Sequence, residues 1–405
     1  MGPRLQGVKL QATSRQARKL RLIPVSLQWR AIWAMALSSA TSGITTGLVP
    51  AVVSLNLADR GVSSTLIGIN SAMPYVALLC LGPFLPHLIK RLGAVPALVM
   101  GILGNAAVFM AFPFVSSTAG WFLLRFLFGV FNAFPWMVSE IWINRVAGNA
   151  IRGRALTLYI SLWGLGFALG PQIIALVGHR GPLPFMIAVV LMVASMLPPL
   201  VARRLAPDVA AHEHKGFVGE VVRRAPLPLF AALAGGAGEI TIFSLFPIYA
   251  KSVWNSPLVM TSALTVFAIG GFLLQLPGGW LADRIGRLRF LLLYAALSAL
   301  GAFLLPHLAG SPLLWPMVFI WGGAVIGMYS AGLMLLGDVF SMGDMAGANT
   351  VYAMAYTVGS ILGPVFSGWA MKVWPAQGFT LSMVVLFGIL AAMCIIGERK
   401  RGMAR

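Results

Sequence analysis

Residues 279–289 read GWLADRIGRLR, a short charged stretch between two long apolar runs at 257–281 and 290–308. The whole chain of 405 residues is 59% hydrophobic and only 10% charged. Soluble domains carry about 25% charged residues, so a chain this apolar could not cover a water-facing surface. A charged loop between two apolar runs of about 20 residues therefore predicts a protein that crosses a membrane repeatedly.

Twelve apolar segments are long enough to cross ~30 Å of hydrocarbon as α-helices, which takes about 20 residues each. They are 31–56, 65–89, 95–115, 120–142, 155–178, 183–201, 227–250, 257–281, 290–308, 314–338, 350–371 and 379–396. Most connections are short, which favours antiparallel neighbours. The connection 202–226 is longer than the others, and it divides the chain into two sets of six predicted helices. The expected parts are a basic N-terminal segment 1–30, a six-helix bundle 31–201, a central loop 202–226, a second six-helix bundle 227–396 and a tail 397–405.

The basic residues gather on one side of these predicted helices. Of the 29 lysines and arginines, 24 fall on the side that holds both termini. Four fall on the other side: Arg60, Arg180, Lys251 and Lys372. Positive charge marks cytoplasmic loops, so both termini are expected in the cytoplasm, with the helices in a bacterial inner membrane. The net charge of +19 then reflects topology and contact with lipid headgroups, and no nucleic-acid partner is expected.

Two short patterns recur at one offset. Residues 166–171 read GFALGP and 359–364 read GSILGP, while 90–93 read KRLG and 283–286 read DRIG. Each pair is separated by 193 residues. Two independent patterns with one offset predict a parallel repeat of six helices, as in carriers with a pseudo-two-fold axis along the membrane normal. The expected fold is an all-α membrane protein of two pseudo-symmetric six-helix bundles.

The stretch 279–289 resembles the loop signature of the major facilitator superfamily, at the place of that family's second copy. The resemblance implies a latch that holds one gate closed. In it, Gly279 would permit close helix approach, Asp283 would lie near a helix N-terminus, and the arginines would pair with cytoplasmic acids. The first-half copy departs from the pattern, because Lys90 replaces the aspartate. The residues assigned to gating are Gly279, Asp283, Arg284, Gly286, Arg287, Arg289, Glu140, Asp338, Arg91, Arg152, Arg154, Gly166, Gly170, Pro171, Gly359, Gly363 and Pro364.

Further motifs narrow the resemblance. Arg125 and Gly129 are similar to the Arg-x-x-x-Gly motif of the superfamily. Residues 166–171 resemble a motif associated with antiport but lack its following glycines, which weakens that inference. The runs 43–50 (GITTGLVP), 140–144 (EIWIN) and 152–159 (RGRALTLY) look like the small YcaD-like branch. That branch implies no particular substrate.

Glu239 is the most informative of the ten acids. It lies near the middle of the segment 227–250, hence ~18 Å deep at 1.5 Å per residue. An ionised acid there costs roughly 2.5–3.5 kcal/mol and usually faces a cavity. The resemblance places this helix among those that line a central cavity, so Glu239 is expected to bind a proton or a cationic substrate group. The alternative is a permanently protonated acid hydrogen-bonded within the Gly235–Gly238 packing region.

Other candidates are less specific. Arg125 either reaches the interface by snorkelling or faces the cavity as an anion site or a partner of a bound proton. Glu140 and Asp338 are expected to pair with Arg145, Arg152, Arg154, Arg284 or Arg287. The polar and aromatic candidates for substrate contact are Thr41, Thr45, Asn132, Trp136, Tyr249, Trp321 and Tyr329. Apolar walls with few charges favour an amphipathic or weakly charged small molecule.

The expected function is a secondary carrier, with proton-coupled export favoured and a monomer as its form. The alternative is a membrane sensor, scaffold or lipid-handling protein that kept the fold without transport. An enzyme is disfavoured because no catalytic cluster can be read, and no cofactor is expected. No Walker loop suggests ATP coupling. His212-Glu213-His214 lacks further ligands for a metal, and Cys80 and Cys394 show no disulfide or metal spacing.

Overall fold

The computed structural model describes residues 25–147, 151–206, 218–254, 256–341 and 344–403. The regular elements in these ranges are helices. In chain order they are α2 (Val25–Asp59), α3 (Ser64–Leu81), α4 (Leu85–Leu92), α5 (Ala94–Ala111), η1 (Phe112–Phe114), α6 (Thr118–Val146), α7 (Arg152–Leu169), α8 (Gln172–Val177), α9 (Leu183–Val201), η2 (Arg203–Leu205), α10 (Val218–Arg224), α11 (Pro226–Trp254), α12 (Pro257–Leu273), α13 (Gln275–Ile285), α14 (Arg287–Leu304), α15 (Leu314–Gly337), α16 (Met345–Val373) and α17 (Gly378–Met403). The segment 1–30 and the central loop 202–226 lie partly outside the described residues, and the sequence 212–214 lies wholly outside them.

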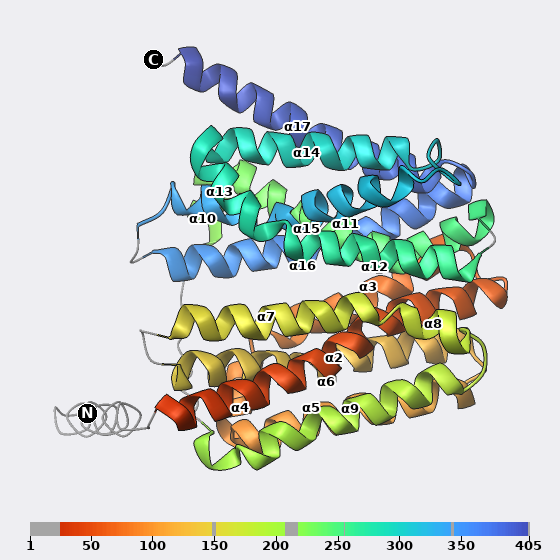
Figure 1. The fold of residues 1–405 in the computed structure, drawn as a ribbon, viewed down its shortest axis with the longest axis vertical. Helices are drawn as coiled ribbons and strands as arrows, with labels where there is room; N and C mark the ends of the chain where they lie inside the picture. Colours follow the sequence, from red (N-terminus) through yellow and green to blue (C-terminus); the bar gives the residue numbers. More distant parts are fainter. Residues whose placement is uncertain (1–24, 148–150, 207–217, 255, 342–343, 404–405) are drawn as a thin grey trace.

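The helices form two bundles that lie side by side (Figure 1). In the first half, α2 packs on α7 and α9, and α5 packs on α6 and α9. In the second half, α11 packs on α16 and α15, and α14 packs on α17 and α15. The halves meet where α3 contacts α16, where α7 contacts α12 and where α2 contacts α11. The predicted all-α fold of two bundles is confirmed.

The predicted count of twelve spans is not reached by length and composition alone. Ten helices in the described residues are long and apolar enough to cross a membrane, or eleven if α12 and α13, bent by 54°, form one span. The predicted span 350–371 lies within α16, which has 29 residues but does not qualify. This helix packs against α11 and α3 from both halves. The faces that pack on other helices can carry small and polar residues, while Phe366 and Trp369 are exposed on the remaining face of α16.

Prolines account for the main differences from the predicted boundaries. The predicted segment 65–89 breaks between α3 and α4 around Pro83, and 155–178 breaks between α7 and α8 at Pro171. A proline lacks the N–H that would continue a helical ladder, and its ring crowds the preceding turn. The first helix begins at Val25, earlier than the predicted 31.

The glycines of the repeated motif occupy equivalent places in the two halves. A Cβ atom at any of the four would collide with the backbone of a neighbouring helix, and each second-half contact lies 193 residues after its counterpart. The contacts are Gly166 with Ala40, Gly170 with Ile44, Gly359 with Leu233 and Gly363 with Ala237. The repeat seen in the sequence is therefore a repeat in helix packing, α7 on α2 and α16 on α11.

The second repeated pattern ends in a glycine with equivalent geometry. Gly93 has φ +87° and Gly286 has φ +91°, a region that side chains with a Cβ rarely adopt. Each ends a short helix and begins the next one, α5 or α14. The shared glycine therefore makes the sharp turn that both loops need.

Candidate functional site

Glu239 lies on α11 where α16 approaches most closely. A Cβ atom at Gly236 would collide with the carbonyl of Tyr356, so only glycine permits this helix spacing. One turn further along α11, the Tyr356 hydroxyl donates a hydrogen bond of 2.9 Å to Oε2 of Glu239. Glu239 nevertheless keeps part of its surface accessible. The close packing of α11 and α16 thus places a carboxyl group with one hydrogen bond in mid-helix.

The surroundings of Glu239 come from both halves. The ring of Tyr329 meets that of Tyr356 edge to face at 5.3 Å. Tyr75 of α3, in the first half, lies within electrostatic range of both Glu239 and Arg125. Because α3 also packs on α11 and α16, Glu239 faces the junction of the halves. It does not face lipid.

Arg125 of α6 is buried on the first-half side of this junction, with 2% of its surface exposed. Its guanidinium carbon lies 5.7 Å from the centre of the Phe128 ring. A snorkelling arginine keeps its head group in water or among headgroups. Arg125 does not, so the interior alternative agrees with the structure.

The other first-half residues predicted to contact substrate differ in how much of each side chain is exposed. Asn132 is partly exposed. Thr41 and Thr45 turn their hydroxyls back to helix carbonyls of their own helix α2, at 3.0 and 2.8 Å. Trp136 is 54% exposed. Trp136 follows Asn132 by one helical turn and Arg125 by three, so these three side chains share one face of α6.

Two second-half candidates are packing residues. Tyr249 and Trp321 are each 1% exposed within the main hydrophobic core. The indole of Trp321 donates to the Ser298 carbonyl at 3.0 Å, which ties α15 to α14. The ring of Tyr249 stacks on Phe379 at 5.1 Å. Neither side chain is accessible to a solute in the state described here.

Three polar residues of the junction were absent from the predicted set. Tyr75 and Asn70 lie on α3, and Tyr356 lies on α16. The candidates predicted for substrate or proton binding all lie in the first, fourth, seventh and tenth predicted spans, whereas these three residues belong to the second and eleventh. The signal was present in the sequence, because a tyrosine or asparagine inside an apolar segment needs a polar partner.

The charged motif lies at the end of the bundles where α2 begins, here called the termini face. Arg287 forms an ion pair with Asp338, as expected, and donates to the Met334 carbonyl at 3.0 Å. Arg289 pairs with Glu398 at 2.7 Å. These contacts tie α14 to α15 and α17. They hold the second half together at this face.

Other gating assignments differ from the structure. The expectation for Gly279 is wrong, since a Cβ atom there would meet nothing within 4 Å. Asp283 and Glu140 are exposed, and among the described residues neither forms an ion pair. Arg284 instead lies over the Trp280 ring at 3.7 Å. Arg152 donates to Asn144 at 2.9 Å. Arg91 and Arg154 are exposed.

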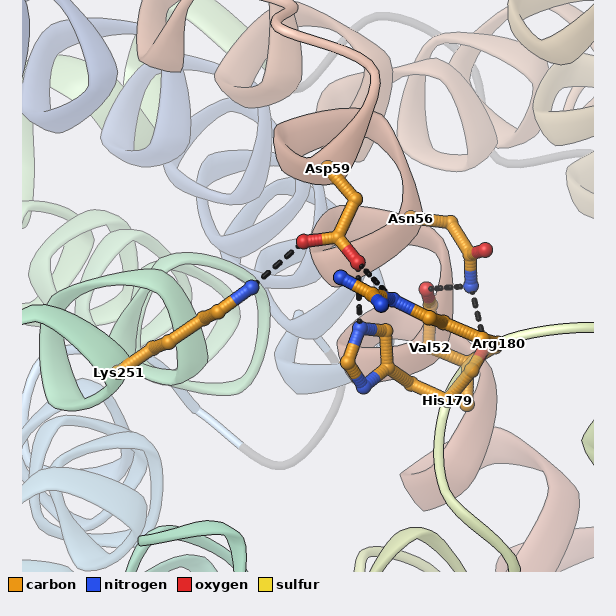
Figure 2. Close-up of polar contacts among 6 residues, drawn as sticks. All are labelled: Val52, Asn56, Asp59, His179, Arg180 and Lys251. Atoms are coloured by element: carbon orange, nitrogen blue, oxygen red, sulfur yellow. Dashed lines mark hydrogen bonds and ion pairs between the residues drawn. The ribbon is translucent and has the colours of Figure 1, made fainter. Parts of the chain in front are cut away.

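An ion-pair cluster joins the halves at the opposite end, where α2 ends, here called the Asp59 face (Figure 2). Oδ1 of Asp59 contacts Nζ of Lys251, from the second half, at 2.5 Å. Its Oδ2 contacts Arg180 at 2.7 Å and His179 at 2.9 Å, both from the first half. Asn56 fixes this loop by donating to the His179 carbonyl at 2.5 Å. One carboxylate thus ties the end of α11 to the first half.

Further bonds between the halves lie toward the same face. Ser64 donates to the Gly368 carbonyl at 2.8 Å, and Thr265 donates to the Ala168 carbonyl at 2.7 Å. A Cβ atom at Gly68 would collide with the Pro364 backbone. Together with the Asp59–Lys251 ion pair, these bonds join the two halves toward the Asp59 face. The protein is therefore closed at the Asp59 face.

Replacing Lys251 by methionine should weaken this closure. A partly exposed ion pair contributes about 0.2–1 kcal/mol, so the ratio of open to closed molecules at the Asp59 face should rise by a factor of about 1.4 to 5. Spin labels at Arg60→Cys and Val253→Cys, both exposed at this face on opposite halves, would report the change. The expected result is a larger population at long inter-label distance.

Arg180→Met is the matched control, because Arg180 meets the same carboxylate from within the first half. Both native cysteines, Cys80 and Cys394, are replaced first. Equal shifts in the two variants would mean that the cluster stabilises a loop and does not close the interface.

Comparison with known proteins identifies the fold. The family model described as "Major Facilitator Superfamily" matches residues 34–255 and 228–405. The chain is 27% identical over 383 residues to the "Uncharacterized MFS-type transporter YfkF" of Bacillus subtilis (strain 168), covering 90% of this chain and 95% of that one. It is 28% identical over 292 residues to the "Uncharacterized MFS-type transporter YcaD" of Escherichia fergusonii, covering 71% and 74%.

Solved structures share the architecture at low identity. The nucleoside transporter NupG superposes with a TM-score of 0.74 at 14% identity, covering 91% of this chain and 98% of that one. A bacterial homologue of the human lysosomal transporter Spinster superposes with a TM-score of 0.72 at 16% identity, covering 93% and 98%. At such identity these likenesses concern the fold alone.

Proposed function

The chain belongs to the Major Facilitator Superfamily, and on that premise we propose that this multi-pass membrane transporter exports a small amphipathic or weakly charged solute by proton-coupled alternating access. The observation that carries the proposal is Glu239. It is a mid-helix carboxyl at the junction of the halves, with one hydrogen bond, from Tyr356, and part of its surface accessible.

A single carboxyl in such a place suits reversible protonation. Membrane interiors disfavour an ionised acid, so Glu239 would hold a proton when closed from water and release it when a side opens. The hydroxyl of Tyr356 can donate to the carboxylate form. The partial accessibility of Glu239 favours this role over a permanently sealed, protonated acid.

The closure at the Asp59 face suits one state of an alternating-access cycle. The distribution of basic residues favours a cytoplasmic position for the termini face, in a bacterial inner membrane. The state described here would then be closed toward the outside, as loading of a solute from the cytoplasm for export requires. Transport would need the Asp59 cluster to open.

Purified protein in liposomes with an imposed pH gradient tests the proposal. An internal pH-sensitive dye reports proton movement, so no labelled solute is needed. Solutes are added in matched neutral, anionic and cationic sets. The expected result is proton flux that depends on both protein and solute. A folded protein that shows no such flux with any set would favour the alternative, a sensor, scaffold or lipid-handling protein.

A further inference from the structure

Arg125 is a buried cation without a partner anion. Its Nε and Nη1 atoms are fully buried and have no hydrogen-bond partner within the described parts of the chain. The centre of the Phe128 ring lies 5.7 Å from the guanidinium carbon. Across those same residues it forms no ion pair with an aspartate or glutamate. The charge of Arg125 is therefore buried in the first half without a neutralising group among the described residues.

Such an arrangement is energetically unfavourable by itself. A guanidinium keeps its charge in proteins, and buried charges are normally paired or hydrogen-bonded because an unpaired one is strongly disfavoured. Snorkelling does not relieve Arg125, since only 2% of its surface is exposed. A bound anion would satisfy the two free donors and the charge together.

A second buried polar side chain lies at the same level. Asn70 of α3 is 1% exposed, and both of its amide atoms lack a partner in the described residues. A Cβ atom at Gly129 would collide with the Pro74 backbone, so α3 and α6 cross there. Both helices start near the Asp59 face, and Asn70 and Arg125 each lie one turn before the crossing, on the same stripe as Pro74 and Gly129.

Tyr75 connects this pair to the proposed proton site. Its phenol lies within electrostatic range of both Arg125 and Glu239. Three kinds of donor therefore converge on one region: a guanidinium, a carboxamide and a phenol. Each can donate to an oxyanion.

We propose that Arg125, with Asn70 and Tyr75, binds the anionic group of the transported solute, and that the solute is an organic monoanion such as a carboxylate. This inference rests on the proposed transport function. One cation suits a single negative charge, and a guanidinium matches a carboxylate through two parallel hydrogen bonds. The tyrosine and phenylalanine rings nearby suit an apolar body on the solute.

The first test needs no ligand. In a low-salt buffer without added oxyanions, Arg125→Met should raise the thermal unfolding midpoint of the purified full chain by about 2 °C or more, because an unpaired buried charge is removed. Arg60→Met is the matched control, since Arg60 is exposed over Trp121 and its loss should not raise the midpoint. A lower midpoint for Arg125→Met would overturn the proposal, because it would mean that Arg125 is satisfied within the fold.

The second test uses benzoate, phenylacetate and octanoate, each with its amide and its amine, and sodium chloride. At least one carboxylate should raise the unfolding midpoint of the native chain, and its amide and amine should not. Arg125→Met should weaken the apparent affinity for that carboxylate about tenfold or more, whereas Glu239→Gln should still bind it.

Equal stabilisation by amides or amines, a response to chloride alone, or no response to any carboxylate would each overturn the proposal. These readouts do not involve proton flux. A protein that binds carboxylates but moves no protons would refute the proposed function and leave the anion site intact. A protein that moves protons with neutral solutes would refute the anion site and leave the proposed function intact.

Discussion

Glu239→Gln should abolish solute-driven proton flux, with a loss of at least ~100-fold, the lower range for a positioned proton-transfer group. Glutamine keeps the shape of the side chain and can still accept the Tyr356 hydrogen bond, but its amide cannot take up and release a proton. The measurement is dye-reported proton flux in liposomes. Exchange of solute without a pH gradient should persist, because exchange requires no net proton movement.

The matched control is Glu220→Gln, which neutralises an exposed acid on α10 that pairs with Arg224. It should leave proton flux within about twofold of the native chain, since exposed i,i+4 pairs of this kind contribute about 0.3–0.5 kcal/mol. Normal gradient-driven flux in Glu239→Gln, at equal protein amounts, would exclude Glu239 as the proton carrier.

Tyr356→Phe separates the proton role from the packing role. The phenylalanine ring keeps the contact with Tyr329 but removes the one hydrogen bond to Glu239. A hydrogen bond to a charged group contributes about 1.5–3 kcal/mol. Flux should therefore fall about tenfold or more but persist, and its pH dependence should differ from that of the native chain. An unchanged pH profile would mean that the hydrogen bond has no part in proton binding.

The fold was predictable because its determinants are local and repeated. Apolar runs of about 20 residues predict membrane-spanning helices, and the motif shared by residues 166–171 and 359–364 indicates that the two halves are repeats. The structure places both copies against equivalent backbones, Gly166 on Ala40 and Gly359 on Leu233. Mid-helix Glu239 could be found for a related reason, since acids are rare in membrane-spanning segments and usually face the bundle interior or a cavity.

The site was only partly predictable, because which side chains face it depends on how each helix is rotated about its own axis. Trp136 and Trp321 look alike in the sequence, yet one is 54% exposed and the other 1%. Rotation is set by packing against neighbours, and no single segment encodes it. The Asp59 cluster shows the same limit, since its ion pair to Lys251 spans 192 residues of sequence. Such a contact appears only once the halves are brought together.

Gly359→Ala should destabilise the protein strongly, whereas Gly388→Ala should stabilise it. In an unconstrained helix, alanine is more favourable than glycine by about 1 kcal/mol. Gly388 of α17 meets nothing within 4 Å, so it should show this ordinary gain. At Gly359 the added methyl collides with the Leu233 carbonyl, and α16 must move away from α11. Overpacking of this kind costs roughly 1–3 kcal/mol or more.

The midpoint of thermal unfolding is measured for both variants in the same detergent. Because the midpoint should fall in Gly359→Ala and rise in Gly388→Ala, the comparison does not depend on the absolute midpoint in that detergent. Separation of α16 from α11 would also break the contact of Gly236 with Tyr356 and move the Tyr356 hydroxyl away from Glu239. Proton flux should therefore fall in Gly359→Ala even in molecules that fold.

Since Gly166 meets Ala40 in the same way, Gly166→Ala should also destabilise the chain but leave the Glu239 hydrogen bond in place. Equal stabilisation of the chain by alanine at 359 and 388 would show that α16 and α11 do not pack at this distance.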